Sequence, residues 1–350
     1  MPVTINCDMG ESFGLYRMGD DAGMMPLIHI ANVACGFHAS DFNHMRATVR
    51  LAKAHGVKVG AHPSLPDLQG FGRREMKMAR EEMANCIIYQ VGALAGFLKA
   101  TELGCDRLEM DVVITGDSQV LVSHEPWMEH RICRTPAGDS ITEAQELSFN
   151  IHRMTLAEVQ AFDCGRSAHP DFPEQENAPA FKPTLRQVVE AVDEKAMEDG
   201  SAGPGFNIEI KSDPKLYGTF QPPPERFVRL VLAEIADLGI EQRCVIQSFD
   251  PAILEAVHAQ NEDLPLSLLV ENEDGLAANL RRLSFKPDYY SPDHRMVDKA
   301  LVKALQERDI ALLVWTVNDK DDMRRMIKLG ADGIITDDPA KLIGVLDEAE

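Results

Sequence analysis

The sequence predicts an α/β protein, and two observations lead to that prediction. Short β-prone runs alternate with longer stretches of helical periodicity along the whole chain, which is the pattern of α/β architecture. At 350 residues the chain is also long enough to bury a full core, as one large α/β barrel or as two smaller domains.

Each element is expected where the local pattern changes period. Strands are expected at residues 3–6, 29–34, 58–61, 107–113, 120–123, 206–211, 244–249, 266–270, 289–291, 311–317 and 333–336. Helices are expected at residues 41–55, 80–103, 185–199, 224–238, 251–260, 293–308 and 319–329. The proline-rich, acidic stretch 171–183 is typical of a surface loop, and so is 212–223.

The charge is distributed unevenly. Residues 1–104 hold ten acidic and ten basic side chains, so the net charge of −21 lies entirely on the rest of the chain. Such an acidic body repels nucleic acids and anionic membrane surfaces, so we expect neither as a partner. A small anionic substrate would need a local cation to offset this field, which makes a bound metal plausible. No linker separates the two parts, so they are expected to share one continuous α-to-β unit.

Composition also bears on location and redox state. The longest apolar stretches, such as 310–317, are too short to span a bilayer, and Asp8 and Glu11 interrupt any signal peptide. We therefore expect a cytoplasmic protein. The seven cysteines have no C-x-x-C spacing, which favours reduced thiols over a disulfide framework or a zinc site.

Polar side chains recur near the ends of the central strands. Glu109 and Asp111 are two residues apart, so period-two geometry places both on one face, as it does Glu209 and Lys211. His124 ends the short strand between them. Active sites of parallel barrels lie at such strand ends. Three carboxylates suit a hard divalent cation, Mg²⁺ or Ca²⁺, with Lys211 adding positive charge and His124 moving a proton. Taken alone, a pair of acidic residues on a strand more often lies on a solvated face or forms an ion pair, and a single histidine at a strand end is usually a surface or core residue.

The same segments resemble the glycerophosphodiester phosphodiesterase family. The matching stretches are 102–112 (Glu-Leu-Gly-Cys-Asp-Arg-Leu-Glu-Met-Asp-Val), 122–125 (Val-Ser-His-Glu), 154–159, 183–185, 207–211 (Asn-Ile-Glu-Ile-Lys), 245–249, 289–292, 314–318 and 333–339. The resemblance implies a (β/α)8 TIM-type barrel that hydrolyses glycerophosphodiesters to glycerol 3-phosphate and an alcohol. It also implies site roles: metal ligands Glu109, Asp111 and Glu209, a catalytic histidine His124, a phosphate contact Lys211, and the pocket residues Gln247 and Trp315, which are equally compatible with simple packing.

Two departures from that family stand out. Its opening strand ends in His-Arg-Gly and is followed by Glu-Asn-Thr, which supply a second catalytic histidine and a phosphate-binding arginine. Neither motif occurs upstream of Glu102, and Glu125 stands where the family commonly has aspartate.

The first hundred residues resemble a different family, LamB/YcsF, whose members form part of bacterial 5-oxoprolinase. The matching stretches are 5–11 (Ile-Asn-Cys-Asp-Met-Gly-Glu), 31–39 (Ala-Asn-Val-Ala-Cys-Gly-Phe-His-Ala), 60–74 and 89–94. The resemblance implies a βα barrel whose polar strand ends, here Asp8, Glu11, His38 and His62, line the site, although well over half of that barrel is missing. Alternatively, His38 and His62 are only structural.

These observations combine into one interpretation: an irregular N-terminal α/β addition, residues 1–104, packed into or onto a phosphodiesterase-like barrel, residues 105–350, that lacks its usual first strand. We hypothesise that strand 58–61 fills this place and that His62 replaces the missing catalytic histidine. The expected activity is metal-dependent hydrolysis of a small phosphodiester, impaired by the lost strand. Amide hydrolysis of the 5-oxoprolinase type and a catalytically inactive fusion remain alternatives; the oligomeric state is left open.

Overall fold

The computed structural model describes residues 5–13, 16–36, 38–40, 42–62, 71, 73, 103–167, 178–199 and 203–348. The chain divides into two compact units, and each is described by itself. Unit 1 comprises Met1–Ala93 and Ala168–Ala180, and unit 2 comprises Leu94–Ser167 and Phe181–Glu350. The helix expected at residues 80–103 lies almost wholly outside the described residues.

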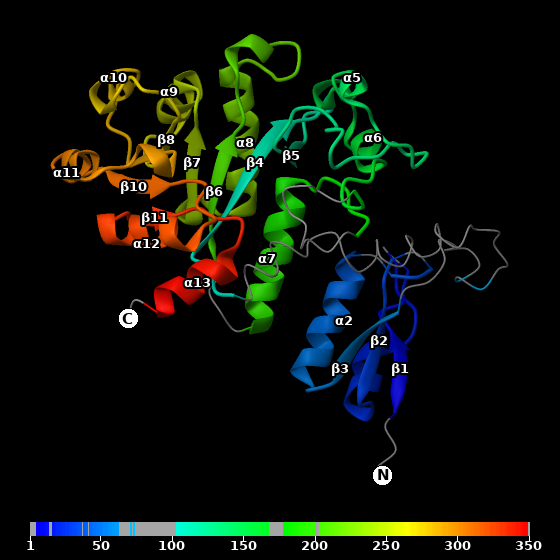
Figure 1. Ribbon diagram of the computed structural model, residues 1–350. Helices are drawn as coiled ribbons and strands as arrows, with labels where there is room; N and C mark the ends of the chain where they lie inside the picture. Colours follow the sequence, from blue (N-terminus) through cyan, green and yellow to red (C-terminus); the bar gives the residue numbers. More distant parts are fainter. Residues whose placement is uncertain are drawn as a thin grey trace. The chain divides into compact units, whose positions relative to one another are not determined.

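Unit 1 contains a three-stranded parallel sheet of order β1-β2-β3. Its elements are β1 (Asn6–Met9), α1 (Asp21–Met24), a 3₁₀ turn η1 (Met25–Leu27), β2 (Ile30–Ala34), α2 (Phe42–Ala54) and β3 (Lys58–His62). Helix α2 runs alongside the sheet (Figure 1). Its Met45 and Val49 pack against a small core that includes Met9, Val33 and Val57, so the spacing of four residues gives α2 its apolar stripe.

One expectation about this unit is wrong, and another stays a prediction. The strand expected at residues 3–6 begins at Asn6, because Asn6 pairs with Ile30 and the register continues to Met9 opposite Val33. Strand β3 pairs along its length with β2, from Lys58 opposite Ile30 to His62 opposite Ala34. It therefore belongs to the three-stranded sheet of unit 1. That it also takes the place of the first barrel strand stays a prediction.

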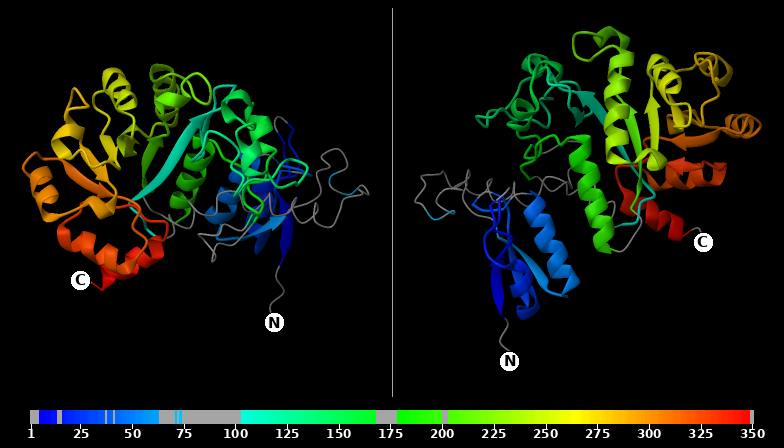
Figure 2. Two further views of the ribbon diagram at one scale, coloured as in Figure 1. Left: turned by 45° about the horizontal axis from the view of Figure 1, so that its top comes forward. Right: turned by 180° about the vertical axis from the view of Figure 1, so that it is seen from behind.

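Unit 2 contains a curved eight-stranded sheet of order β11-β10-β9-β8-β7-β6-β4-β5 (Figure 2). Its strands are β4 (Arg107–Ile114), β5 (Val120–Val122), β6 (Gly205–Ile210), β7 (Cys244–Ser248), β8 (Leu266–Val270), β9 (Tyr289–Pro292), β10 (Ala311–Val314) and β11 (Gly333–Ile334). Neighbouring strands from β4 to β11 are parallel, whereas β5 is antiparallel to β4. The segment at 120–123 is thus an excursion from β4, and the described residues supply seven parallel strands of the barrel.

Helices follow the strands in the alternation that the sequence predicts. They are α5 (Glu143–Glu146), α6 (Leu156–Gln160), α7 (Leu185–Asp199), α8 (Pro224–Leu238), α9 (Pro251–Gln260), α10 (Leu276–Leu280), α11 (Lys299–Gln306), α12 (Lys320–Leu329) and α13 (Pro339–Asp347), with 3₁₀ turns η2 (Ile151–Arg153), η3 (Pro214–Leu216), η4 (Glu241–Arg243) and η5 (His294–Met296). The bounds predicted for α7, α8 and α9 are confirmed.

Aspartates set several helix starts in unit 2. The side chains of Asp250, Asp298, Asp319 and Asp338 each accept a backbone N–H from the first turn of the following helix, which satisfies donors that the helix itself leaves unpaired. Asp298 explains one error: the helix expected at 293–308 begins only at Lys299, and a 3₁₀ turn precedes it.

Between β5 and α7 the chain forms a small separate core. Its buried members include Leu121, Met128 and Phe162, and a disulfide joins Cys133 to Cys164 across 31 residues of sequence. The expectation of reduced thiols is therefore wrong for this pair, because widely spaced cysteines meet where the segment folds back on itself. Within the described part of the chain, no helix is both long enough and apolar enough to cross a membrane.

Candidate active site

Three polar side chains stand side by side near the carboxyl ends of the central strands. Asp111 on β4 is in register with Glu209 on β6, and Glu209 is in register with Gln247 on β7. Glu109 lies two residues before Asp111, on the same face of β4. The alternation of strand side chains therefore brings polar groups together inside an otherwise apolar sheet.

The carboxylates form the cluster that the sequence predicts. One oxygen from each of Glu109, Asp111 and Glu209 lies within 4.8 Å of the others. The Lys211 ammonium is 3.3 Å from Asp111 Oδ1 and 3.2 Å from Glu209 Oε1. Three ionised carboxylates and one ammonium leave a charge of −2, which a divalent cation would neutralise.

Burial and mutual repulsion perturb these groups. Burial, followed by the charges of Asp111 and Glu209, raises the pKa of Glu109 well above its usual range. Burial and Asp111 raise the pKa of Glu209 to about 7. Burial opposes the charge of Lys211, but Glu209 and Asp111 outweigh it and raise its pKa. Such shifts indicate a site that stabilises added positive charge.

Gln247 orients the cluster. Its side-chain amide donates to Glu109 Oε1 at 2.9 Å, and its own oxygen accepts from the Asn207 amide at 2.8 Å. Gln247 and Asn207 are almost fully buried, so these hydrogen bonds replace those that their side chains would make with water. Gln247 thus bonds directly to a carboxylate of the cluster, whereas the resemblance implies that it lines the pocket. Asn207 is a site residue that the sequence analysis missed, although it lies two residues before Glu209.

His124 lies beside Lys211. Its Nε2 is 3.0 Å from the Lys211 ammonium, and its Nδ1 is 2.8 Å from Glu125 Oε1. The partners fit a tautomer in which Nδ1 donates to Glu125 and Nε2 accepts from Lys211. The hydrogen bond to Glu125 raises the pKa of His124, and the same bond lowers the pKa of Glu125. Glu125 therefore holds the His124 ring through its Nδ1.

Lys182 is a second residue that sequence reasoning missed. It lies in the stretch expected to be a surface loop, yet it is buried and donates to Ser123 Oγ at 2.7 Å. Burial lowers the pKa of Lys182 to about 8, against the opposing charges of Glu129, Glu125 and Asp111. Ser123 in turn donates to the Glu125 carbonyl at 2.6 Å. The only sequence signal was the phenylalanine-lysine-proline order at 181–183, which interrupts the polar loop.

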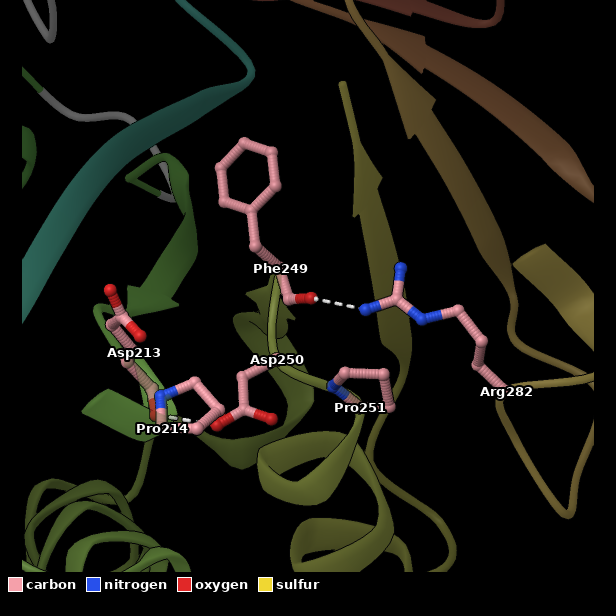
Figure 3. A pocket seen from close by; sticks show the side chains of 7 residues that line it. Asp213, Pro214, Phe249, Asp250, Pro251 and Arg282 are labelled. Atoms are coloured by element: carbon pink, nitrogen blue, oxygen red, sulfur yellow. Dashed lines mark hydrogen bonds between the residues drawn. The ribbon is translucent and has the colours of Figure 1, made fainter. Parts of the chain in front are cut away.

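Trp315 and a pocket lie along the same rim of the sheet. Trp315 Nε1 donates to the Ser291 carbonyl, and its ring meets the Phe249 ring edge-on at 5.4 Å. Phe249 also lines a pocket of about 310 Å³, where the Arg282 guanidinium donates to the Phe249 carbonyl (Figure 3). The other lining residues are Ser212, Asp213, Pro214, Asp250 and Pro251, which follow β6 and β7 directly. The pocket therefore begins one residue after Lys211.

The donors present fit a hard divalent cation. Three carboxylates offer only oxygen ligands, the set preferred by Mg²⁺ and Ca²⁺. Their raised pKa values indicate that positive charge placed among them, whether a proton or a cation, would be stabilised.

The predicted residues of unit 1 form a different group. Glu11, His38 and His62 each place one ligand atom within 4.8 Å of the others, and Asp8 Oδ1 is 3.8 Å from His62 Nδ1. The structure thus gathers these four residues at the strand ends of the three-stranded sheet.

A curved parallel sheet with covering helices and an acidic, lysine-containing cluster at its carboxyl strand ends defines unit 2 as an enzyme of the TIM-barrel class. Residues 93–341 match the glycerophosphoryl diester phosphodiesterase family, and the chain belongs to that family. A Silicibacter pomeroyi protein classed as a glycerophosphoryl diester phosphodiesterase superposes with a TM-score of 0.64 at 28% identity, covering 73% of this chain and 88% of that one. An Oleispira antarctica phosphodiesterase, solved with sn-glycerol-3-phosphate, shares the fold with a TM-score of 0.54 at 19% identity, covering 73% and 90%.

Residues 3–110 match a second family, LamB/YcsF. A 5-oxoprolinase subunit from Vibrio campbellii is 58% identical over 104 residues, 29% of this chain and 41% of that protein. The corresponding 5-oxoprolinase subunit from Tolumonas auensis is 60% identical over 98 residues, 28% of this chain and 39% of that protein. The chain thus spans about two fifths of the length of these relatives.

Proposed function

We propose that this protein hydrolyses glycerophosphodiesters to glycerol 3-phosphate and an alcohol, with Mg²⁺ or Ca²⁺ held by Glu109, Asp111 and Glu209. The observation that supports it is the convergence of these carboxylates with Lys211 and His124 at the ends of β4, β5 and β6. The product bound to the Oleispira antarctica phosphodiesterase agrees with this substrate class.

The bound cation would supply a Lewis acid that stabilises charge on the phosphoryl oxygens. Lys211 would contact the phosphate, because its ammonium already faces two of the ligands. His124 Nε2, held by the Nδ1 bond to Glu125, would accept or donate the proton that moves in the reaction. Gln247 would keep Glu109 in place, and the pocket beside Phe249 would receive the alcohol portion.

We further propose that turnover is reduced relative to family members that keep the His-Arg-Gly strand. In the described residues, β3 pairs with β2 of the smaller sheet, and the seven parallel strands of unit 2 carry no His-Arg-Gly motif. His62 remains our candidate for the second catalytic histidine only as a prediction from sequence.

The test is release of glycerol 3-phosphate from glycerophosphocholine, glycerophosphoethanolamine and glycerophosphoglycerol, with Mg²⁺, with Ca²⁺ and with chelator. Glu109→Gln and His124→Ala are expected to lower kcat by at least about 100-fold, as removal of catalytic or ligating groups does. Lys215→Met, which changes an exposed lysine on η3, is the matched control. Folded wild-type protein without turnover on any diester, with either cation, would refute the proposal. Retained turnover in His62→Ala would remove His62 from the mechanism.

A second candidate function, ring-opening amide hydrolysis of 5-oxoproline, is favoured by the convergence of Glu11, His38 and His62. Glutamate release from 5-oxoproline and ATP, measured with and without added partner proteins, tests it. We rank it second because the chain lacks more than half the length of the proteins that carry that name.

A further inference from the structure

A second cluster of ligand-type side chains lies in unit 1, at the carboxyl ends of three adjacent parallel strands. Glu11 follows β1 by two residues, His38 lies in the turn after β2, and His62 is the last residue of β3. Because the strands are parallel and in register, their ends meet at one edge of the sheet. This is the edge at which α/β proteins bind ligands. One donor atom from each of the three side chains lies within 4.8 Å of the others.

Among the described residues, three ring nitrogens of His38 and His62 lack the hydrogen bonds that buried histidines normally make. His38 is 2% exposed, yet neither Nδ1 nor Nε2 has a hydrogen-bond partner among the described residues. His62 Nδ1 is buried and also without a hydrogen-bond partner there. Buried polar atoms are nearly always satisfied, and an unsatisfied one costs about 1–3 kcal/mol. Three unsatisfied ring nitrogens in one small cluster therefore indicate a missing ligand better than they indicate a packed core.

The arrangement of the rings also favours a shared ligand. Their centroids are 4.7 Å apart with planes tilted by 58°, so the rings do not stack on each other. Phe71 contacts His38 edge-on at 5.4 Å and closes one side of the cluster.

We propose that Glu11, His38 and His62 bind a divalent transition metal ion of the zinc class, at a site separate in composition from the carboxylate cluster of unit 2. Two imidazoles with one carboxylate are a donor set of borderline softness, preferred by Zn²⁺ and its first-row neighbours. The all-oxygen cluster of Glu109, Asp111 and Glu209 suits Mg²⁺ or Ca²⁺ instead. The two proposed metal sites therefore differ in their ligand atoms: nitrogen and oxygen in unit 1, oxygen alone in unit 2.

The spacing requires only a modest adjustment. Ligands of a tetrahedral Zn²⁺ ion, at about 2.0–2.2 Å from the metal, lie roughly 3.4 Å from one another. The ligand atoms of Glu11, His38 and His62 lie within 4.8 Å of one another, so small side-chain rotations bring them to this spacing. Asp8 is the fourth acidic or imidazole group here: its Oδ1 is 3.8 Å from His62 Nδ1 and accepts from the Asn32 amide at 3.0 Å. It either orients His62 or completes the ligand set.

The experiment uses the full chain, stripped with chelator and then titrated with Co²⁺ or Zn²⁺ in excess Mg²⁺, which occupies the oxygen site. Visible absorption reports Co²⁺ coordination, and metal analysis after gel filtration reports retained Zn²⁺. Wild-type protein is expected to retain one equivalent. Glu11→Gln, His38→Ala and His62→Ala are expected to bind the metal at least about 100-fold more weakly. Removing even an outer partner of a metal ligand lowers metal affinity about 10–100-fold.

Control variants separate this site from adventitious binding. His55→Ala changes an exposed histidine whose Nδ1 contacts the Leu51 carbonyl, and Cys35→Ser removes a free thiol that directly follows β2; both should keep the Co²⁺ spectrum. Glu109→Gln should also keep it. Circular dichroism checks folding, and Glu11→Gln, which preserves side-chain shape, decides the matter if His38→Ala unfolds. Folded wild-type protein that retains no Zn²⁺, or an unchanged Co²⁺ affinity in Glu11→Gln and His62→Ala, would overturn the proposal.

Discussion

Gln247 and Glu109, 138 residues apart in sequence, are joined by a 2.9 Å hydrogen bond from the glutamine amide to the carboxylate. The bond links β7 to β4 past the intervening strand β6. It reaches an oxygen of a buried, predicted metal ligand, so the neutral residue Gln247 is bonded directly to the charged cluster.

Replacing Gln247 with leucine should therefore weaken Mg²⁺ or Ca²⁺ binding and lower kcat by about 10–100-fold, the usual cost of losing an outer partner of a metal ligand. Isothermal titration of the cation and steady-state kinetics measure the two effects. Ser267→Ala is the control, because Ser267 occupies the neighbouring position on β8 and its hydroxyl makes no hydrogen bond within the described residues. Equal cation affinities in Gln247→Leu and wild type would contradict the supporting role.

The pKa of Glu209 predicts how the metal-free protein responds to pH. Its folded value is raised from 4.5 to about 7, so between those values the folded state binds the proton more tightly than the unfolded state. The free energy of unfolding should therefore fall as pH rises through this window. Denaturant titrations in chelator measure this pH dependence for wild type and for Glu209→Gln, and it should be weaker in the variant, where only Glu109 keeps a raised pKa. Parallel pH profiles would contradict it.

Lys182 predicts a separation of stability from activity. Burying an ammonium is costly, so Lys182→Met should leave the unfolding midpoint unchanged or raise it. The same change removes the donor to Ser123, whose hydroxyl holds the carbonyl of Glu125 beside His124. We expect kcat to fall by about tenfold, within the range that general acid–base groups contribute. Arg226→Met, at an exposed residue of α8, serves as the surface control. A normal kcat in Lys182→Met would show that Lys182 is only structural.

The disulfide predicts a reductant-sensitive segment. Cross-linking Cys133 to Cys164 closes a loop of 31 residues, which in the chain-entropy view stabilises by about 3–4 kcal/mol. Reductant should lower the unfolding midpoint of wild-type protein and leave that of the Cys133→Ser, Cys164→Ser double variant unchanged. Mass spectrometry of alkylated protein counts the free thiols. Identical midpoints with and without reductant would show that the bond does not contribute.

Local patterns predicted much of this molecule. Period-two spacing placed Glu109 with Asp111 and Glu209 with Lys211 before any strand was paired, and the bounds of α8 followed from its proline start and apolar stripe. These features depend only on neighbours in sequence, so the residues themselves specify them.

What the sequence left undetermined depends on contacts between distant segments. The burial of Lys182 requires Ser123 to come near from 59 residues away. The pairing of Cys133 with Cys164 requires a fold-back of the excursion. The pairing of β3 with β2 has the same origin, because residues 58–62 show the period of a strand but not the neighbour with which that strand pairs.

The antiparallel excursion has one more consequence, for local opening. Strand β5 pairs with β4 only at Val112–Ile114, so the earlier half of β4, which holds Glu109 and Asp111, is paired on one side alone within the described residues. Backbone amides there that point away from β6 have no strand partner and should exchange with solvent deuterium much sooner than those of β6, which has a neighbour on each side. A cation bound by Glu109 and Asp111 would clamp this half-paired stretch, so slowed exchange at residues 107–111 would report occupancy of the site without any substrate.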